Sequence, residues 1–105
     1  MNITVSELIV RYLERLGIEV LFGMPGGHVL PIYDRLHGSR VKSVLVKHEQ
    51  GAAFMAGGYA RAGHRVAACI ATAGPGATNL VTGIANAYAE RLPVLAITGE
   101  TSTYI

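Results

Sequence analysis

Apolar positions near the start of the chain recur at the spacing of an α-helix. Thr4 and Glu7 form a capping box, and Ile3 can pack onto Leu8 as a hydrophobic staple. Gly17 stands where a left-handed C-terminal cap is expected. The pattern predicts a helix between Thr4 and Gly17, with one apolar stripe formed by Val5, Leu8, Ile9, Tyr12, Leu13 and Leu16.

Beyond this helix, short apolar runs alternate with further helical patterns. Because each short run is almost continuously apolar, we expect a parallel sheet that helices cover on both faces, a three-layer α/β/α fold. Right-handed crossovers would make it doubly wound. The predicted helices cover about 28–36, 50–61 and 77–89, and the predicted strands are 19–22, 43–46, 66–71 and 93–98.

Gly57 and Gly58 lie inside the third predicted helix. Glycine in a helix interior costs about 1 kcal/mol relative to alanine. We therefore expect another element to pack very close to these two residues.

The predicted sheet has an open end. No closing helix follows Thr98 before Ile105, so the outermost strand would keep an apolar, unpaired edge. We expect residues 1–105 to be one domain that is incomplete at its C-terminus, apparently truncated after four strands. A chain this short with uncovered edges should be marginally stable or prone to aggregation alone.

Composition removes several classes of function. Half of the 105 residues are apolar and 15% are charged, and the net charge of +2 comes from scattered Lys and Arg. This argues against nucleic acid or a membrane surface as a partner. The start lacks a signal-peptide pattern, and the single cysteine, Cys69, lies in an apolar run typical of a buried thiol. We expect a cytoplasmic protein, and His28, His37 and His64 show no spacing that suggests a metal site.

Three loops follow predicted strands and should meet at one edge of the sheet, where ligands of open parallel sheets bind. These loops are Gly23–Gly27, His48–Gln50 and Thr72–Gly76. Neither the Gly-x-Gly-x-x-Gly fingerprint nor a Walker sequence is present, which argues against a nucleotide fold. Gly74-Pro75-Gly76 opens a helix and fits either an anion site or a tight turn.

Glu49 is the acidic residue of the middle loop. It could simply be a glutamate that the helix macrodipole stabilises by about 0.3–1 kcal/mol, or a carboxylate that faces a ligand. The two glycine-rich loops at the same edge favour the ligand-facing alternative. His48 could be an acid or base, although a surface histidine beside a strand end is the commoner case.

Five segments resemble the acetolactate synthase group of thiamine diphosphate enzymes, in order and at compatible spacing. The resemblance runs from the first helix to Gly99. The segments are Phe22–Gly27, His48–Ala53, Gly58–Arg61, Thr72–Asn79 and Gly83–Ala87.

This resemblance implies a role for particular residues. In the family, the glutamate after the second strand hydrogen-bonds to N1′ of the cofactor's aminopyrimidine and so promotes deprotonation of the thiazolium C2. The matching residue is Glu49, which would be the catalytic activator. The resemblance also implies that Pro25, Gly26, Thr72, Pro75 and Asn79 line the thiamine diphosphate site.

The resemblance further implies partners outside this chain. Members hold the diphosphate through Mg²⁺ with a Gly-Asp-Gly…Asn motif in a separate domain of another subunit, and this chain lacks that motif. The chain alone would be inactive, as half of a site in a homo-oligomer. The full-length protein would act on pyruvate or another 2-oxo acid as a carboligase or lyase, with FAD binding left open. The alternatives are a 2-oxo acid decarboxylase and a non-catalytic pyrimidine-type module that pairs with a partner chain.

Overall fold

The computed structural model describes residues 2–103 as an α/β fold with one parallel sheet. Helices and strands alternate through most of the chain, as the sequence predicts. In chain order the elements are α1 (Val5–Arg15), β1 (Val20–Gly23), α2 (Leu30–Leu36), β2 (Lys42–Leu45), α3 (Glu49–Gly63), β3 (Ala67–Ala71), α4 (Pro75–Thr78), α5 (Val81–Ala89) and β4 (Val94–Thr98).

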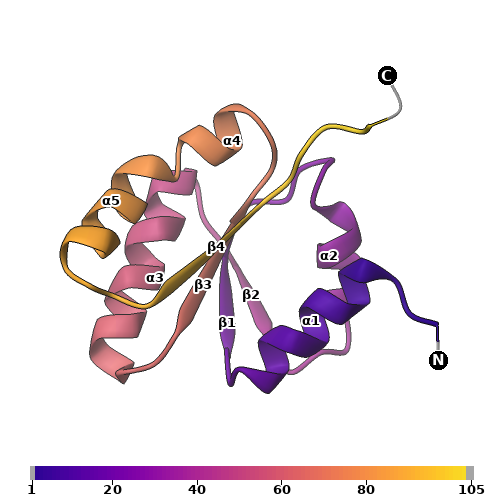
Figure 1. Cartoon of the computed structure of the whole chain (residues 1–105), viewed down its shortest axis with the longest axis horizontal. Helices are drawn as coiled ribbons and strands as arrows, with labels where there is room; N and C mark the ends of the chain where they lie inside the picture. The colour runs from indigo at the N-terminus through magenta and orange to yellow at the C-terminus, as the bar shows by residue number, and fades with distance from the viewer. Residues whose placement is uncertain (1, 104–105) are drawn as a thin grey trace.

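The sheet has the strand order β2-β1-β3-β4, and its three strand pairs are all parallel. Helices α1 and α2 lie on one face, while α3, α4 and α5 lie on the other (Figure 1). Side chains of the central strands alternate between the two faces: Leu21 and Ile70 belong to the α1/α2 core, and Phe22 and Cys69 to the α3 core. The three-layer expectation is confirmed.

Cys69 has no exposed surface, and burial raises the pKa of its thiol to about 11. The prediction of a buried structural thiol is therefore confirmed. In residues 2–103, no helix is both long and apolar enough to cross a bilayer.

The predicted caps of α1 are present, but its apolar stripe does not lie where the pattern suggests. Thr4 Oγ1 accepts the backbone N–H of Glu7 at 3.1 Å, and Gly17 has a φ of +77°. The buried residues of the helix are Val10 and Leu13. Four members of the predicted stripe, Val5, Leu8, Tyr12 and Leu16, are exposed, because α1 meets the sheet through a face rotated towards Val10.

The close approach expected at Gly57 and Gly58 occurs elsewhere. A Cβ on Gly57 would make only an ordinary contact with Leu92, and a Cβ on Gly58 would meet nothing within 4 Å. The tight contact is on the partner helix, where a Cβ on Gly83 of α5 would lie 2.3 Å from Ala53 Cβ. The glycine that permits α3 and α5 to touch is therefore Gly83, and the prediction for the adjacent pair was wrong.

The single helix expected over 77–89 is divided into α4 and α5. The break falls at Asn79 and Leu80, where the Leu80 N–H donates to the Ala77 carbonyl, a tighter i→i−3 bond. Leu80 is 2% exposed, so its side chain is part of the core. The break lets Leu80 pack inward while Asn79 turns towards the end of the sheet.

The outer strands β2 and β4 both have exposed residues. All four residues of β2 are exposed, and Leu95 of β4 is partly exposed. Neither a helix nor a strand follows Thr98 as far as residue 103. Residues 104 and 105, on which the expectation of an open end also rests, lie outside the described residues.

Candidate functional site

The strand order places a topological switch point between β1 and β3. From β1 the chain proceeds through α2 to β2 on one side, and β3 and β4 are added on the other side. The loop after β1 leads to α2 on one face of the sheet, whereas the loop after β3 leads to α4 on the opposite face (Figure 1). A crevice outside the carboxyl ends of the strands at such a point is the usual ligand site of open α/β sheets.

Glu49 is the first residue of α3 and is half-buried. Asn79 Nδ2 donates to Glu49 Oε1 at 3.1 Å. Within residues 2–103, Oε2 of the same carboxylate accepts no hydrogen bond, and it lies 3.6 Å from where a Cβ on Gly76 would be. One oxygen is thus fixed by the protein while the other stays available as an acceptor.

Thr72 links the loops after β1 and β3. A Cβ on Gly26 would lie 2.4 Å from Thr72 Cβ, and a Cβ on Gly76 would lie 2.9 Å from Thr72 Cγ2. Any side chain at either glycine would collide with Thr72. The contact at Gly26 brings the loop after β1 directly against the Thr72 side chain of the loop after β3. Four of the predicted residues, Gly26, Glu49, Thr72 and Asn79, therefore form one continuous cluster around Gly76.

The two predicted prolines lie outside this cluster. Pro25 and Pro75 are both exposed. Pro75 begins α4, and its carbonyl accepts the backbone N–H of Asn79 at 2.9 Å. None of the hydrogen bonds and close approaches found in residues 2–103 joins either proline ring to Glu49. The structure thus brings four of the six predicted residues into contact and leaves the prolines at the margin.

The two histidines near this edge have different roles. His48 caps α3, because its Nδ1 accepts the backbone N–H of Gln50 at 3.0 Å. His28, for which the sequence analysis found no metal-binding partner, joins the site through Thr72. Its backbone N–H lies 3.4 Å and its Nδ1 3.3 Å from Thr72 Oγ1. Its position two residues after Gly26 places it beside the first loop, but no sequence pattern indicates its contact with Thr72.

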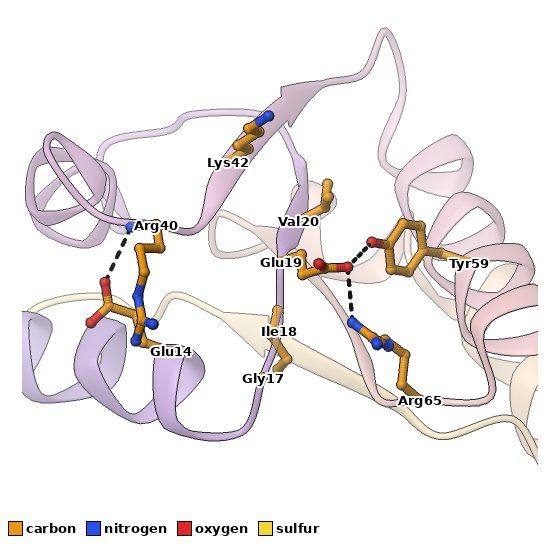
Figure 2. A pocket seen from close by; sticks show the side chains of 9 residues that line it. All are labelled: Glu14, Gly17, Ile18, Glu19, Val20, Arg40, Lys42, Tyr59 and Arg65. Carbon is orange, nitrogen blue, oxygen red and sulfur yellow. Dashed lines mark hydrogen bonds and ion pairs between the residues drawn. The ribbon is translucent and has the colours of Figure 1, made fainter.

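A hollow of about 550 Å³ lies at the end of β1 that is opposite to the switch point. Figure 2 shows that its central carboxylate, Glu19, points to Tyr59 and Arg65. Glu19 Oε1 accepts from the Tyr59 hydroxyl at 2.6 Å and from Arg65 at 2.9 Å. Glu14 is likewise occupied, by the Ser39 hydroxyl at 2.7 Å. Because one oxygen of each carboxylate is bound by groups of other elements, this hollow joins elements of the fold together.

A metal centre made by this part of the chain has no support. In residues 2–103, no three or more His, Cys, Asp or Glu side chains gather closely enough to hold a metal ion. The chemistry at the switch point is that of one carboxylate, one amide, one hydroxyl and one imidazole. These groups can donate hydrogen bonds to a flat, nitrogen-containing ring and accept hydrogen bonds from it.

Comparison with known proteins identifies the family of this chain. Residues 3–105 match the thiamine pyrophosphate enzyme family, N-terminal TPP binding domain. The acetolactate synthase of Mycobacterium avium is 54% identical over 100 residues, which are 94% of this chain and 16% of that protein. The acetolactate synthase large subunit of Corynebacterium glutamicum is 55% identical over the same shares of the two chains.

A third relative has a slightly lower sequence identity. The acetolactate synthase isozyme 2 large subunit of Escherichia coli is 50% identical over 97 residues, 92% of this chain and 18% of that protein. The chain thus spans about a sixth of the length of these curated relatives. With a family match over nearly its whole length, the chain belongs to the thiamine pyrophosphate enzymes, as an N-terminal TPP-binding domain.

Proposed function

We propose that this domain binds the aminopyrimidine of thiamine diphosphate at the switch point between β1 and β3. The observation that carries the proposal is the Glu49 carboxylate, which Asn79 holds by Oε1 while Oε2 stays available. A half-buried carboxylate oxygen is a suitable acceptor for a ring N–H, and charge-assisted hydrogen bonds of this kind are short and strong. The residues present therefore fit the cofactor.

Each residue of the cluster has a distinct task in this proposal. Glu49 accepts the hydrogen bond from the pyrimidine ring nitrogen and holds the proton there. Asn79 fixes the orientation of that carboxylate. Thr72 and Gly26 bring the two loops together, and Pro25 and Pro75, which are exposed at the margin of the cluster, would contact the bound cofactor. When bound, the cofactor supplies the electron sink needed to decarboxylate a 2-oxo acid.

For the whole protein we propose an acetolactate synthase-like activity: decarboxylation of pyruvate or another 2-oxo acid, followed by carbon–carbon bond formation. The names of the relatives support this choice over a simple decarboxylase or a non-catalytic module. We further propose that Mg²⁺ and the diphosphate are held by a domain outside these residues, on another subunit of a cytoplasmic homo-oligomer. In this proposal residues 1–105 alone do not turn over substrate.

The test is Glu49→Gln in the complete protein that carries this sequence. Glutamine keeps the shape of the side chain but cannot hold a proton on the ring nitrogen, so we expect kcat to fall about 100-fold or more. Acetolactate and CO₂ released from pyruvate are the quantities to measure. Circular dichroism checks that the fold is retained.

Asp34→Asn is the matched control, because it removes one exposed carboxylate from α2, away from the cluster. Its kcat should equal that of the wild type. If Glu49→Gln turns over pyruvate at the wild-type rate, the proposed role of Glu49 is wrong. If the wild-type protein releases CO₂ from pyruvate without forming acetolactate, the activity is that of a decarboxylase.

A further inference from the structure

The ring of His28 is tethered at one nitrogen by the hydroxyl of Thr72. A threonine hydroxyl has one proton to donate and two lone pairs that accept. Thr72 Oγ1 lies 3.4 Å from the His28 backbone N–H, which can only donate, and 3.3 Å from His28 Nδ1. Within residues 2–103, the hydrogen bonds give the hydroxyl proton no acceptor except Nδ1. When the hydroxyl donates to Nδ1, the proton of the neutral ring is on Nε2.

The surroundings of His28 cover part of the side chain and leave the rest open. Gly99, directly after β4, approaches so closely that a Cβ there would lie 2.6 Å from His28 Cβ. Thr72 covers the Nδ1 side of the ring. His28 as a whole is nevertheless exposed. The loops after β1, β3 and β4 thus meet at this residue, and within residues 2–103 no hydrogen bond engages its Nε2.

The same threonine connects His28 with the acidic side of the site. Thr72 Cγ2 lies 2.9 Å from where a Cβ on Gly76 would be, and that position lies 3.6 Å from Glu49 Oε2. The switch point therefore presents an acceptor, the carboxylate oxygen of Glu49, and, in the tautomer in which Thr72 donates to Nδ1, a donor, the Nε2–H of His28. A pyrimidine nitrogen that is bound at Glu49 would not use the donor of His28.

We propose that His28 is a substrate-binding residue, whose Nε2–H donates to a carboxylate or keto oxygen of the 2-oxo acid. This inference rests on the proposed function, because it takes the substrate to react beside a pyrimidine ring held at Glu49. A hydrogen bond from a neutral donor to an anionic oxygen is among the stronger ones in proteins. An oriented neutral donor would thus bind the negative charge of the substrate, without a cationic side chain in the loop after β1.

Two substitutions of His28 separate the two nitrogens of the ring. In His28→Asn the amide oxygen can still accept from Thr72 in the place of Nδ1, but no donor reaches the position of Nε2. In His28→Gln the longer side chain brings an amide N–H to about the position of Nε2. In the complete protein we expect His28→Asn to raise the KM for pyruvate about tenfold or more. His28→Gln should stay within a few-fold of the wild type.

Two further measurements do not depend on turnover. Calorimetry should give all three proteins the same Kd for thiamine diphosphate, since His28 faces the substrate and not the pyrimidine. In the ¹⁵N spectrum of the wild-type imidazole, His28 should show a protonated Nε2 and an unprotonated Nδ1. Thr72→Val should abolish this tautomer preference, because it removes the hydroxyl.

The outcomes separate this inference from the proposed function. An unchanged KM in His28→Asn, together with an inactive Glu49→Gln, overturns the role of His28 and leaves that of Glu49 intact. Weaker thiamine diphosphate binding in His28→Asn also overturns it, since His28 would then serve the cofactor or the loop. Active Glu49→Gln protein removes the basis of both proposals.

Discussion

The hydroxyl oxygen of Tyr33 is buried, and in residues 2–103 it is the only buried side-chain N or O atom without a hydrogen-bond partner. Burial raises the pKa of this hydroxyl to about 12. A Cβ on Gly23, at the end of β1, would lie 3.1 Å from the oxygen. The hydroxyl thus fills space under the first loop without being satisfied there.

Removing this hydroxyl should not destabilise the protein. An unsatisfied buried hydroxyl costs about 1–3 kcal/mol in lost hydration, and its replacement by hydrogen removes that cost together with a few packing contacts. We therefore expect Tyr33→Phe to unfold at an equal or higher urea concentration than the wild type. A clear loss of stability would show that the hydroxyl has a partner, such as a buried water molecule.

At the scale of elements, the packing of α3 on α5 depends on one glycine. Gly83→Ala would place a methyl group 2.3 Å from Ala53 Cβ and 3.0 Å from the backbone nitrogen of Phe54. The helices would have to separate, at a cost of about 1–3 kcal/mol for an overpacked core. We expect a lower melting temperature, measured by circular dichroism.

Gly58→Ala is the matched control within the same helix pair. Nothing lies within 4 Å of a Cβ at Gly58, which is exposed within α3. Alanine should therefore stabilise the helix by about 1 kcal/mol. Equal effects of the two substitutions, in either direction, would contradict the contact that the structure assigns to Gly83.

These glycines show how far the sequence could predict the fold. Periodicity and caps were sufficient for the order and type of the elements, since those signals are local. Which glycine permits a close contact, which face of α1 is buried, and where the last helix divides all depend on neighbouring elements. A pattern within one segment cannot contain that information.

The candidate site was predictable to a similar degree. Glu49 and the three loops follow from the position of strand ends in a parallel sheet, and the resemblance to the family added Gly26, Thr72 and Asn79. The contact between Thr72 and His28 was not predictable, because it joins residues of two loops through a side chain. The bond between Asn79 and Glu49 depends on the break between α4 and α5.

At the scale of the whole molecule, the end of the sheet opposite the site is held by charged and phenolic groups. The hydrogen bond from Tyr59 lowers the pKa of Glu19, with Arg65 contributing. The same bond raises the pKa of Tyr59. The bond therefore joins α3, the start of β1 and the turn before β3 while Glu19 is ionised and Tyr59 is protonated.

This bond should contribute to stability only within a window of pH. The contribution of Glu19 is present above the ordinary carboxyl pKa of 4.5 and is lost as the pH falls through the lowered value of the folded state. That of Tyr59 is present below its ordinary pKa of 10.0 and is lost as the pH rises through the raised value. The difference in urea midpoint between wild type and Tyr59→Phe should be largest between those limits.

Tyr59→Phe suits this measurement because it keeps the ring, which packs edge-on against Phe22 with centroids 5.9 Å apart. Only the hydroxyl and its bond are removed. A midpoint difference that stays constant from acid to alkaline pH would mean that the hydroxyl does not stabilise the fold through Glu19.

The strand order also determines when the site comes into existence during folding. β1 pairs with β2 through Val20 and Lys42, and β3 with β4 through Ala67 and Val94, so each pair closes a short stretch of chain. β1 meets β3 through Leu21 and Ala68, across a longer stretch whose closure costs more chain entropy. The contact between Thr72 and the first loop forms only with that pairing. We therefore expect the two halves of the sheet to join and the candidate site to form in the same step.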